Sequence, residues 1–329
     1  MTAIAFSNLA PDDLELVREF ASLSLHARLN CSRGQIELRW MEEIRDLLSN
    51  EGTIAFVARS RATTCGLAVC TPLPWENLLL GKSMWAIKYI GVAPRPGDGS
   101  SIATALVGEI IRRVAARDGD FLLCKLPPSD TTIIHALESS GFLLMDTLLN
   151  FICHCRPSGS NNRLGRLPAG LALRLATSSD IGQLVEVAHA SFANHFGRFH
   201  ADPRIGHAAA TAIYEEWIRS CASGWADWIV VATHGDRIAG YSAWKKPSML
   251  DQRHGIRLGR YSIGAVHPDF FGRGLFTALT REGMEQLRSS ADWIEAPTHI
   301  DNHPVQRGFL RLGWRIAGAQ HAFHKWLKP

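Results

Sequence analysis

The stretch from Ile263 to Leu279 constrains this chain most, because it reads as a strand, a turn, a glycine-spaced loop and a helix in direct succession. Gly272 and Gly274 flank Arg273 where the helix must begin. The first amide groups of a helix have no partner within it, and the helix dipole makes that end positive. Glycines let an anion approach these amides, and Arg273 can add a charge-assisted contact. The stretch predicts a phosphate-binding loop, although two glycines at such a junction are more often only a turn.

Composition sets wider limits. The chain has 329 residues, of which 46% are hydrophobic and 20% charged, so we expect a globular protein with room for two domains. The net charge is +4 and no basic run is present, so we expect no nucleic-acid partner. We also expect no membrane segment, because no apolar run approaches the length of a spanning helix and the N-terminus lacks a signal-peptide pattern.

The seven cysteines are scattered, which fits a reducing compartment and predicts a cytoplasmic location. The segment Cys153-His154-Cys155 has no second ligand pair nearby at a zinc spacing. We therefore expect no metal site.

The predicted elements of the first half match those of the second half in order. Strands are predicted at 85–92 and 257–266, each followed by a helix. Val92-Ala93-Pro94 matches Val266-His267-Pro268, and Ser140-Gly141-Phe142 matches Leu312-Gly313-Trp314. We interpret this pattern as an internal duplication. In the first half, helices are predicted at 102–116 and 131–139.

A segment rich in Pro, Gly, Ser, Asn and Arg separates the two halves and has the composition of a linker. We predict a first domain over residues 1–156, a linker over 157–170 and a second domain over 171–329. The copies differ at the loop, where Asp98 lies between Gly97 and Gly99 and would repel a phosphate. We interpret the first copy as degenerate, with a structural role.

Val-x-Pro, Gly-x-Gly and a following helix resemble motif A of the GNAT superfamily of acyl-CoA N-acyltransferases. Further on, Asn302, Phe309 and Gly313-Trp314 resemble the superfamily's Asn-(six)-aromatic-(three)-Gly-aromatic run. The resemblance implies an α/β fold of two tandem GNAT-like domains, each with a mixed, mostly antiparallel central sheet and helices on both faces. The sequence departs from the superfamily pattern at Phe271, Phe276 and Phe309, which leaves the details of catalysis open.

The resemblance implies acetyl-CoA or another acyl-CoA as cosubstrate. Backbone amides around Ala265 and Val266 would hold the pantetheine and face the developing oxyanion. The other expected cofactor-binding residues would hold the pyrophosphate, bond to the pantetheine or pack against the CoA tail: Gly272, Arg273, Gly274, Leu275, Phe276, Asn302 and Phe309.

The resemblance also implies direct attack of an amine on the thioester, so bound geometry would supply much of the catalysis. The candidate catalytic residues are His299, Asp301 and Tyr261, with His303 and Glu295 as further candidates for a general base. Each histidine has an ordinary alternative as a surface or loop residue. The amine of an amino sugar is only weakly basic, so a dedicated base is not required.

A narrower resemblance, around Arg198-Phe199, Tyr214, Trp217 and the segment 323–326, is to dTDP-fucosamine acetyltransferase-like enzymes. These N-acyltransferases of surface-polysaccharide synthesis act on nucleotide-linked amino sugars. The resemblance implies transfer of an acetyl or short hydroxyacyl group to a nucleotide-linked amino sugar, with dTDP as the expected nucleotide, by a monomer or homodimer. Arg198, Tyr214 and Trp217 would bind this acceptor, because an arginine fork suits a pyrophosphate and aromatic rings stack on bases or sugars.

Two alternatives stay open. One is a GNAT acetyltransferase that acts on another small amine, such as a thiol-pathway amine or an aminoglycoside-like drug, or on a protein N-terminus. Peptide substrates would favour an acidic, open cleft, whereas a nucleotide sugar would favour a basic and aromatic lining. The other alternative is a catalytically silent module that binds acyl-CoA, which the substitutions at Phe271, Phe276 and Phe309 would favour.

Overall fold

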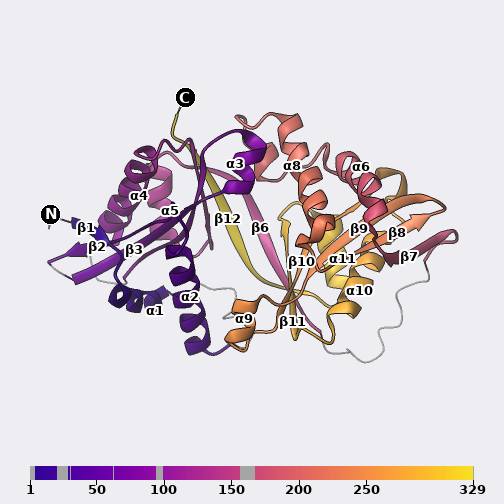
Figure 1. The fold of residues 1–329 in the computed structure, drawn as a ribbon, viewed down its shortest axis with the longest axis horizontal. Helices are drawn as coiled ribbons and strands as arrows, with labels where there is room; N and C mark the ends of the chain where they lie inside the picture. The colour runs from indigo at the N-terminus through magenta and orange to yellow at the C-terminus, as the bar shows by residue number, and fades with distance from the viewer. Residues whose placement is uncertain are drawn as a thin grey trace. The chain divides into compact units, whose positions relative to one another are not determined.

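The computed structural model describes residues 4–20, 29, 31–61, 63–93, 99–155 and 167–328. The chain forms two compact units, which we call unit 1 (residues 1–147 and 319–329) and unit 2 (residues 148–318) (Figure 1). Within the described residues, no helix has the length and apolar character needed to cross a membrane.

The strands of unit 1 follow the order β1-β2-β3-β4-β5-β12. Neighbouring strands are antiparallel except for the parallel pair β4 and β5. Its elements are β1 (Ile4–Asn8), η1 (Pro11–Leu16), α1 (Val17–Phe20), α2 (Arg33–Leu48), β2 (Ile54–Ser60), β3 (Thr63–Pro72), α3 (Pro74–Leu80), β4 (Met84–Val92), α4 (Gly99–Ala115), β5 (Phe121–Leu126), α5 (Thr131–Ser139), the first part of β6 (Leu143–His154) and most of β12 (Arg315–Trp326).

Unit 2 repeats this plan with the strand order β7-β8-β9-β10-β11-β6, again antiparallel except for one parallel pair, β10 and β11. Besides the rest of β6 and the start of β12, its elements are β7 (Leu171–Leu175), η4 (Ser178–Asp180), α6 (Ile181–Phe192), α7 (Arg198–Ala201), α8 (His207–Ser220), η5 (Cys221–Trp225), β8 (Trp228–His234), β9 (Arg237–Lys245), α9 (Met249–Arg253), β10 (Leu258–Val266), η6 (Pro268–Phe270), α10 (Leu275–Leu287), β11 (Trp293–His299) and α11 (His303–Arg311).

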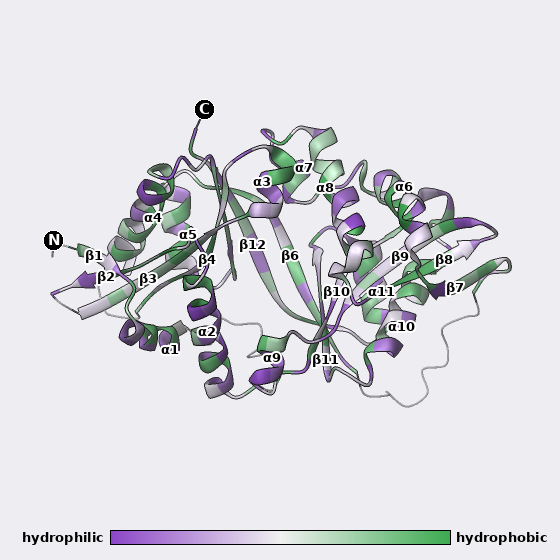
Figure 2. Cartoon of the chain, in the orientation of Figure 1, coloured by the Kyte–Doolittle hydropathy of each residue, from purple (hydrophilic) through white to green (hydrophobic). Residues whose placement is uncertain are grey.

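Helices cover both faces of the sheet of unit 1. Successive side chains of a strand point to opposite faces, so Phe56 and Val57 of β2 enter different cores. Phe56 belongs to the cluster that contains Leu106 of α4, and Val57 to the cluster that contains Ile44 of α2. Figure 2 shows hydrophobic and hydrophilic residues alternating along α2, as expected of a helix with one buried face. The predicted fold class is confirmed.

The duplication is visible in local geometry. The β3–β4 register skips Lys88, and the β9–β10 register skips Ser262 at the matching point. Asp130 and Asn302 cap α5 and α11, and each accepts the amide of the third helical residue, at 3.4 and 3.5 Å. After both helices, the chain turns at a glycine into a buried aromatic residue. We conclude that the two units are copies of one fold, as the sequence pattern predicts.

The two units do not divide at the predicted linker. From Leu148 onward β6 pairs with β11 in unit 2, whereas β12 from Ala319 onward belongs to unit 1 and pairs with β5. Each of the predicted domains 1–156 and 171–329 therefore gives strand residues to the other unit. Residues 156–166, and Pro94, Gly97 and Asp98 of the first glycine loop, lie outside the described residues.

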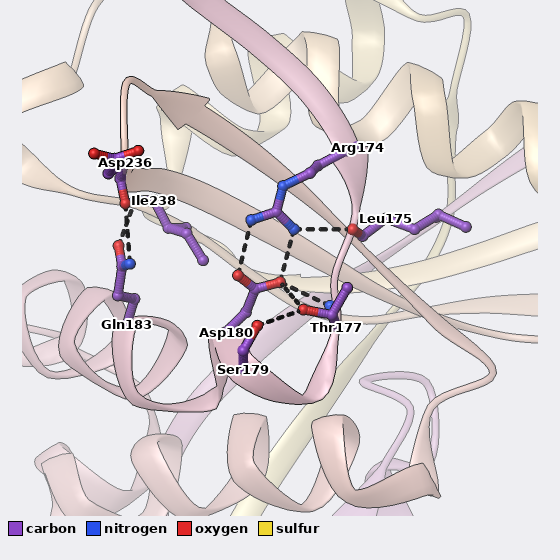
Figure 3. A network of polar contacts seen from close by, with 8 residues as sticks. All are labelled: Arg174, Leu175, Thr177, Ser179, Asp180, Gln183, Asp236 and Ile238. Atoms are coloured by element: carbon purple, nitrogen blue, oxygen red, sulfur yellow. Dashed lines mark hydrogen bonds and ion pairs between the residues drawn. The ribbon is translucent and has the colours of Figure 1, made fainter.

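A polar network fixes the start of α6 in unit 2 (Figure 3). Arg174 donates to both carboxylate oxygens of Asp180 at 2.7 and 2.8 Å, and the Thr177 amide donates to the same carboxylate at 2.7 Å. The Arg174 guanidinium, assisted by Thr177 and opposed by burial, lowers the pKa of Asp180 to about 2. Gln183 accepts the Ile238 amide at 2.7 Å, which ties α6 to β9.

Candidate active site

The strands β10 and β11 diverge within unit 2. Parallel pairing joins residues 258–260 to residues 293–295 and then stops, although the strands continue to Val266 and His299. On its other side, β10 stays paired with β9 as far as Val266. Beyond Arg260, the edge of β10 that faces away from β9 therefore offers backbone groups to a ligand.

The direction of the amides on β10 identifies which residues offer these groups. The His267 amide donates to a β9 carbonyl at 2.9 Å. Because amides alternate in direction along a strand, Ala265 faces β9, whereas Gly264 and Val266 face the diverging edge. The Val266 carbonyl already accepts a hydrogen bond from the Ser191 hydroxyl at 2.8 Å. The Val266 amide and the amide and carbonyl of Gly264 are therefore the backbone groups suited to an extended ligand.

A cavity of about 620 Å³ opens along this edge. The predicted cofactor residues that line it are Ala265, Val266, Gly272, Gly274, Leu275, Phe276 and Asn302. Several further lining residues were not among the predicted site residues, among them Ser191, His195, Phe196, Thr277, Arg307 and Arg311. The structure thus brings together β10, the glycine loop, α11 and the end of α6.

The glycine loop leaves the start of α10 open. Gly272 and Gly274 have φ of +75° and +74°, a conformation that glycine adopts without strain. No side chain caps α10 at Gly274, so the amides of its first turn remain available to an anion. Arg273 does not line the cavity: its guanidinium lies 5.1 Å from the Phe270 ring centroid and donates to the Asp269 carbonyl at 3.3 Å.

Phe276 closes the wall between α10 and α11. A Cβ atom on Gly308 would lie 2.5 Å from the Phe276 ring, so the ring occupies a notch that only glycine leaves. Behind it lies Phe309, with ring centroids 5.3 Å apart. Phe309 is 0% exposed and does not line the cavity, so it can act on a ligand only by supporting Phe276.

The three predicted catalytic residues lie outside the lining. His299 accepts the Asp301 amide on Nδ1 at 3.1 Å, so its neutral ring carries the proton on Nε2. The Asp301 side chain is 73% exposed. The Tyr261 hydroxyl lies against Gly264, where a Cβ atom would be 1.8 Å from it, and burial raises the pKa of Tyr261. Tyr261 and His299 thus stand directly behind lining residues, His299 through Phe196 at 4.8 Å between ring centroids.

His195 is the histidine that lines the cavity. Its ring packs against Phe196 and Tyr214, both with centroids at 5.0 Å. Burial, and then the nearby His200 and His299, lower the pKa of His195 to about 4. His195 is therefore neutral near pH 7, and its burial disfavours the protonated ring.

The predicted acceptor residues form a layer behind the lining. Tyr214 stacks on Phe192 with ring centroids 4.3 Å apart, and Trp217 stacks on Tyr214 at 6.4 Å. The Arg198 guanidinium lies 3.8 Å from the centroid of the Phe199 ring. The structure places none of Arg198, Tyr214 and Trp217 on the cavity wall, where Phe192 and His195 stand instead.

The electrostatic character of the cavity suits an anion. Arg307 and Arg311 line it, and none of its lining residues in the described chain is an aspartate or glutamate. Across the described ranges, no three His, Cys, Asp or Glu side chains are grouped so that they could hold a metal ion.

Comparison with known proteins agrees with the fold. No protein-family model matches the chain. It is 23% identical to the spore coat polysaccharide biosynthesis protein SpsD of Bacillus subtilis over 257 residues, which are 77% of this chain and 81% of that protein. It is 30% identical to the mycothiol acetyltransferase of Actinosynnema mirum over 155 residues, which are 45% of this chain and 46% of that protein.

A solved tandem GNAT protein from the clavulanic acid biosynthesis pathway superposes over 99% of both chains with a TM-score of 0.59, at 17% sequence identity. The chain therefore has the tandem GNAT fold.

Proposed function

We propose that this protein is an acyl-CoA-dependent N-acyltransferase with its active site in unit 2. One observation carries the proposal: the uncapped start of α10 and the diverging edge of β10 line the same cavity. The helix start suits a diphosphate and the strand edge suits a pantetheine, and CoA contains both in sequence. The fold and the acetyltransferase among the relatives support this activity.

The residues of unit 2 have defined roles in the proposed reaction. The amides of Gly264 and Val266 hold the pantetheine, and the Val266 amide faces the carbonyl oxygen as negative charge develops. The amine nitrogen bonds to the carbonyl carbon and the carbon–sulfur bond breaks. His195 takes the proton that the amine loses, and the leaving thiolate takes a proton from water. The Asp301 amide fixes the His299 ring, which supports the lining residue Phe196 from behind.

We further propose that the acceptor is the amine of a nucleotide-linked amino sugar, with a dTDP-sugar as the expected example. The aromatic lining by Phe192, His195 and Phe196, with no carboxylate among the described lining residues, supports an anionic, ring-containing acceptor. The relative named for spore coat polysaccharide biosynthesis supports the same substrate class. In this proposal Tyr214 acts through Phe192 and His195, which its ring contacts. Trp217 supports Tyr214, and Arg198 packs on the Phe199 ring.

The test is a thiol-release assay with acetyl-CoA and longer acyl-CoAs against a panel of dTDP- and UDP-linked amino sugars. We expect release of CoA that depends on an amino sugar. If lysine peptides or protein N-termini proved better acceptors, the proposed substrate class would be wrong. Binding of acyl-CoA without release across the whole panel would identify a silent binding module.

A second candidate acceptor is an amine-bearing thiol. The mycothiol acetyltransferase of Actinosynnema mirum, 30% identical over its matching 155 residues, favours this candidate. Adding amine-bearing thiols to the panel, with acetylated product followed by mass spectrometry, separates the two candidates.

A further inference from the structure

Two arginines on α11 remain without a role in the proposed reaction. Arg307 and Arg311 are one helical turn apart, so they lie on the same face of α11, and both line the cavity. Both are exposed, and neither forms an ion pair with any residue in the described part of the chain. Two unneutralised guanidinium groups at one cavity wall favour an anionic ligand group.

The position of this pair relates it to the start of α10. The Phe276 ring, in the first turn of α10, packs into the notch at Gly308 of α11. Arg307 precedes Gly308 and Arg311 follows it by about one turn. The pair therefore borders the open helix start, within reach of a side chain as long as arginine. The acceptor side of the cavity is formed by a different segment, the end of α6 with His195.

We infer that Arg307 and Arg311 form a second phosphate-binding site in the cavity, which takes the 3′-phosphate of an acyl-CoA. This inference rests on the proposed function. The amides at the start of α10 suit the diphosphate, and the 3′-phosphate stands one ribose away from it as a separate anionic group. A planar guanidinium can bind such a phosphate with two parallel hydrogen bonds.

Unit 1 offers an internal comparison for this site. The caps at Asp130 and Asn302 align α5 with α11, so His135 and Ser139 stand where unit 2 has Arg307 and Arg311. The basic pair thus belongs to unit 2, whose glycine loop leaves the start of α10 open, as expected if both features serve one ligand.

The experiment compares CoA with dephospho-CoA, which lacks only the 3′-phosphate, by calorimetric titration. The proteins are the wild type, Arg307→Gln, Arg311→Gln, the double variant and Arg281→Gln. Arg281 is a matched control, because it lies on α10 outside the cavity lining. Glutamine is a good helix former, so the exposed positions should tolerate it.

We expect the wild type to bind CoA about 10-fold more tightly than dephospho-CoA, as charge-assisted hydrogen bonds at an exposed site allow. The double variant should bind both ligands equally, with its affinity for dephospho-CoA unchanged, and Arg281→Gln should behave as the wild type. The preference of the wild type for CoA over dephospho-CoA should also weaken as salt is added.

Three results would overturn the inference. Equal binding of CoA and dephospho-CoA by the wild type would remove the second site while leaving the proposed function intact. A double variant that keeps the preference but loses affinity for dTDP would assign the pair to the acceptor. A wild type that binds neither ligand would remove the proposed function and this inference together.

Discussion

Unit 1 and unit 2 share their strand order, the position of a strand irregularity and the capping of one helix. They differ in the size of the side chain at one matching position of β4 and β10. Two residues beyond the skipped position, unit 1 has Ile90 on β4 and unit 2 has Gly264 on β10. Ile90 is 7% exposed and belongs to the main core cluster of its unit. Gly264 lines the cavity. At this position unit 1 thus has a buried core side chain, and unit 2 has a glycine on the cavity wall.

The helix that follows this strand also differs between the units. The first buried residue is Ile102 in α4 and Leu275 in α10, and we align the two helices at these residues. In this alignment α4 begins about one turn before Ile102, whereas α10 begins at Leu275 itself. In unit 2 that turn is replaced by Gly272 and Gly274 and an uncapped helix start. The comparison indicates that a duplicated domain keeps its core when the loop before this helix changes.

The largest effect is expected when the residue of unit 1 is placed in unit 2. Gly264→Ile should weaken CoA binding about 100-fold. Even its Cβ atom would lie 1.8 Å from the Tyr261 hydroxyl, and overpacking of this kind costs about 1–3 kcal/mol. The converse change, Ile90→Gly, should leave CoA affinity unchanged and lower the free energy of unfolding by about 3 kcal/mol. Calorimetric titration and denaturant unfolding measure the two effects. Unaltered CoA binding by Gly264→Ile would contradict the placement of the pantetheine.

The next effect concerns catalysis by unit 2. His195→Gln should lower kcat about 100-fold, as loss of a general base does, and leave the Kd for acetyl-CoA within about twofold. Since the pKa of His195 is about 4, its ring is neutral at higher pH and kcat should be flat there, falling only as the pH approaches that value. His189→Gln is the control, because His189 does not line the cavity and is not among the groups that lower the pKa of His195. A full kcat in His195→Gln would assign the proton to water.

A smaller effect is expected at the contact between α10 and α11. Unit 1 has Ala136 where unit 2 has Gly308, and Gly308→Ala would place a Cβ atom 2.5 Å from the Phe276 ring. The ring should turn into the cavity and weaken CoA binding by about 10-fold, within the range for overpacking. Adding Phe276→Leu should restore most of the affinity in the same titration. Ala136→Gly in unit 1 should cost about 1 kcal/mol of stability and no affinity.

The smallest effect concerns stability. The pKa of Asp180 is lowered to about 2 from an ordinary 3.8, so the folded state favours the carboxylate. Its contribution is present above the ordinary pKa and is lost as the pH falls towards 2. Arg174 is half-exposed, so Asp180→Asn should cost only about 1 kcal/mol at pH 7. Denaturant unfolding should show the two proteins converging near pH 2, and a constant difference would contradict this role.

Local signals in the sequence predicted most of the fold. Helix α5 has the predicted bounds, and β10 starts one residue after the predicted 257. The exchange of β6 and β12 was not predicted, because apolar periodicity identifies a strand without indicating which sheet receives it. Predicted domain bounds at the linker assumed that neighbouring segments pair with each other. Pairing over long sequence separation is decided by tertiary packing.

The site was predicted in part for the same reason. Gly272 and Gly274 are recognisable because a tight backbone turn before a helix requires them locally. His195 was not among the predicted site residues, because its place on the cavity wall depends on how the end of α6 packs. Arg307 and Arg311 carry a usable signal, a spacing of one helical turn with no acidic residue a turn away on either side. That spacing shows that Arg307 and Arg311 share one face of a helix, but it does not show that this face lines a cavity.

The exchange of strand residues between the units, by β6 and β12, limits how the coding sequence could be divided. If the reading frame were split at residue 157, the first product would lack the strand that pairs with β5, and the second would lack the strand that pairs with β11. Each fragment would present a bare sheet margin, prone to aggregate. Deleting the half that we interpret as degenerate would thus disable the other half, so we expect selection for the activity proposed for unit 2 to preserve both copies.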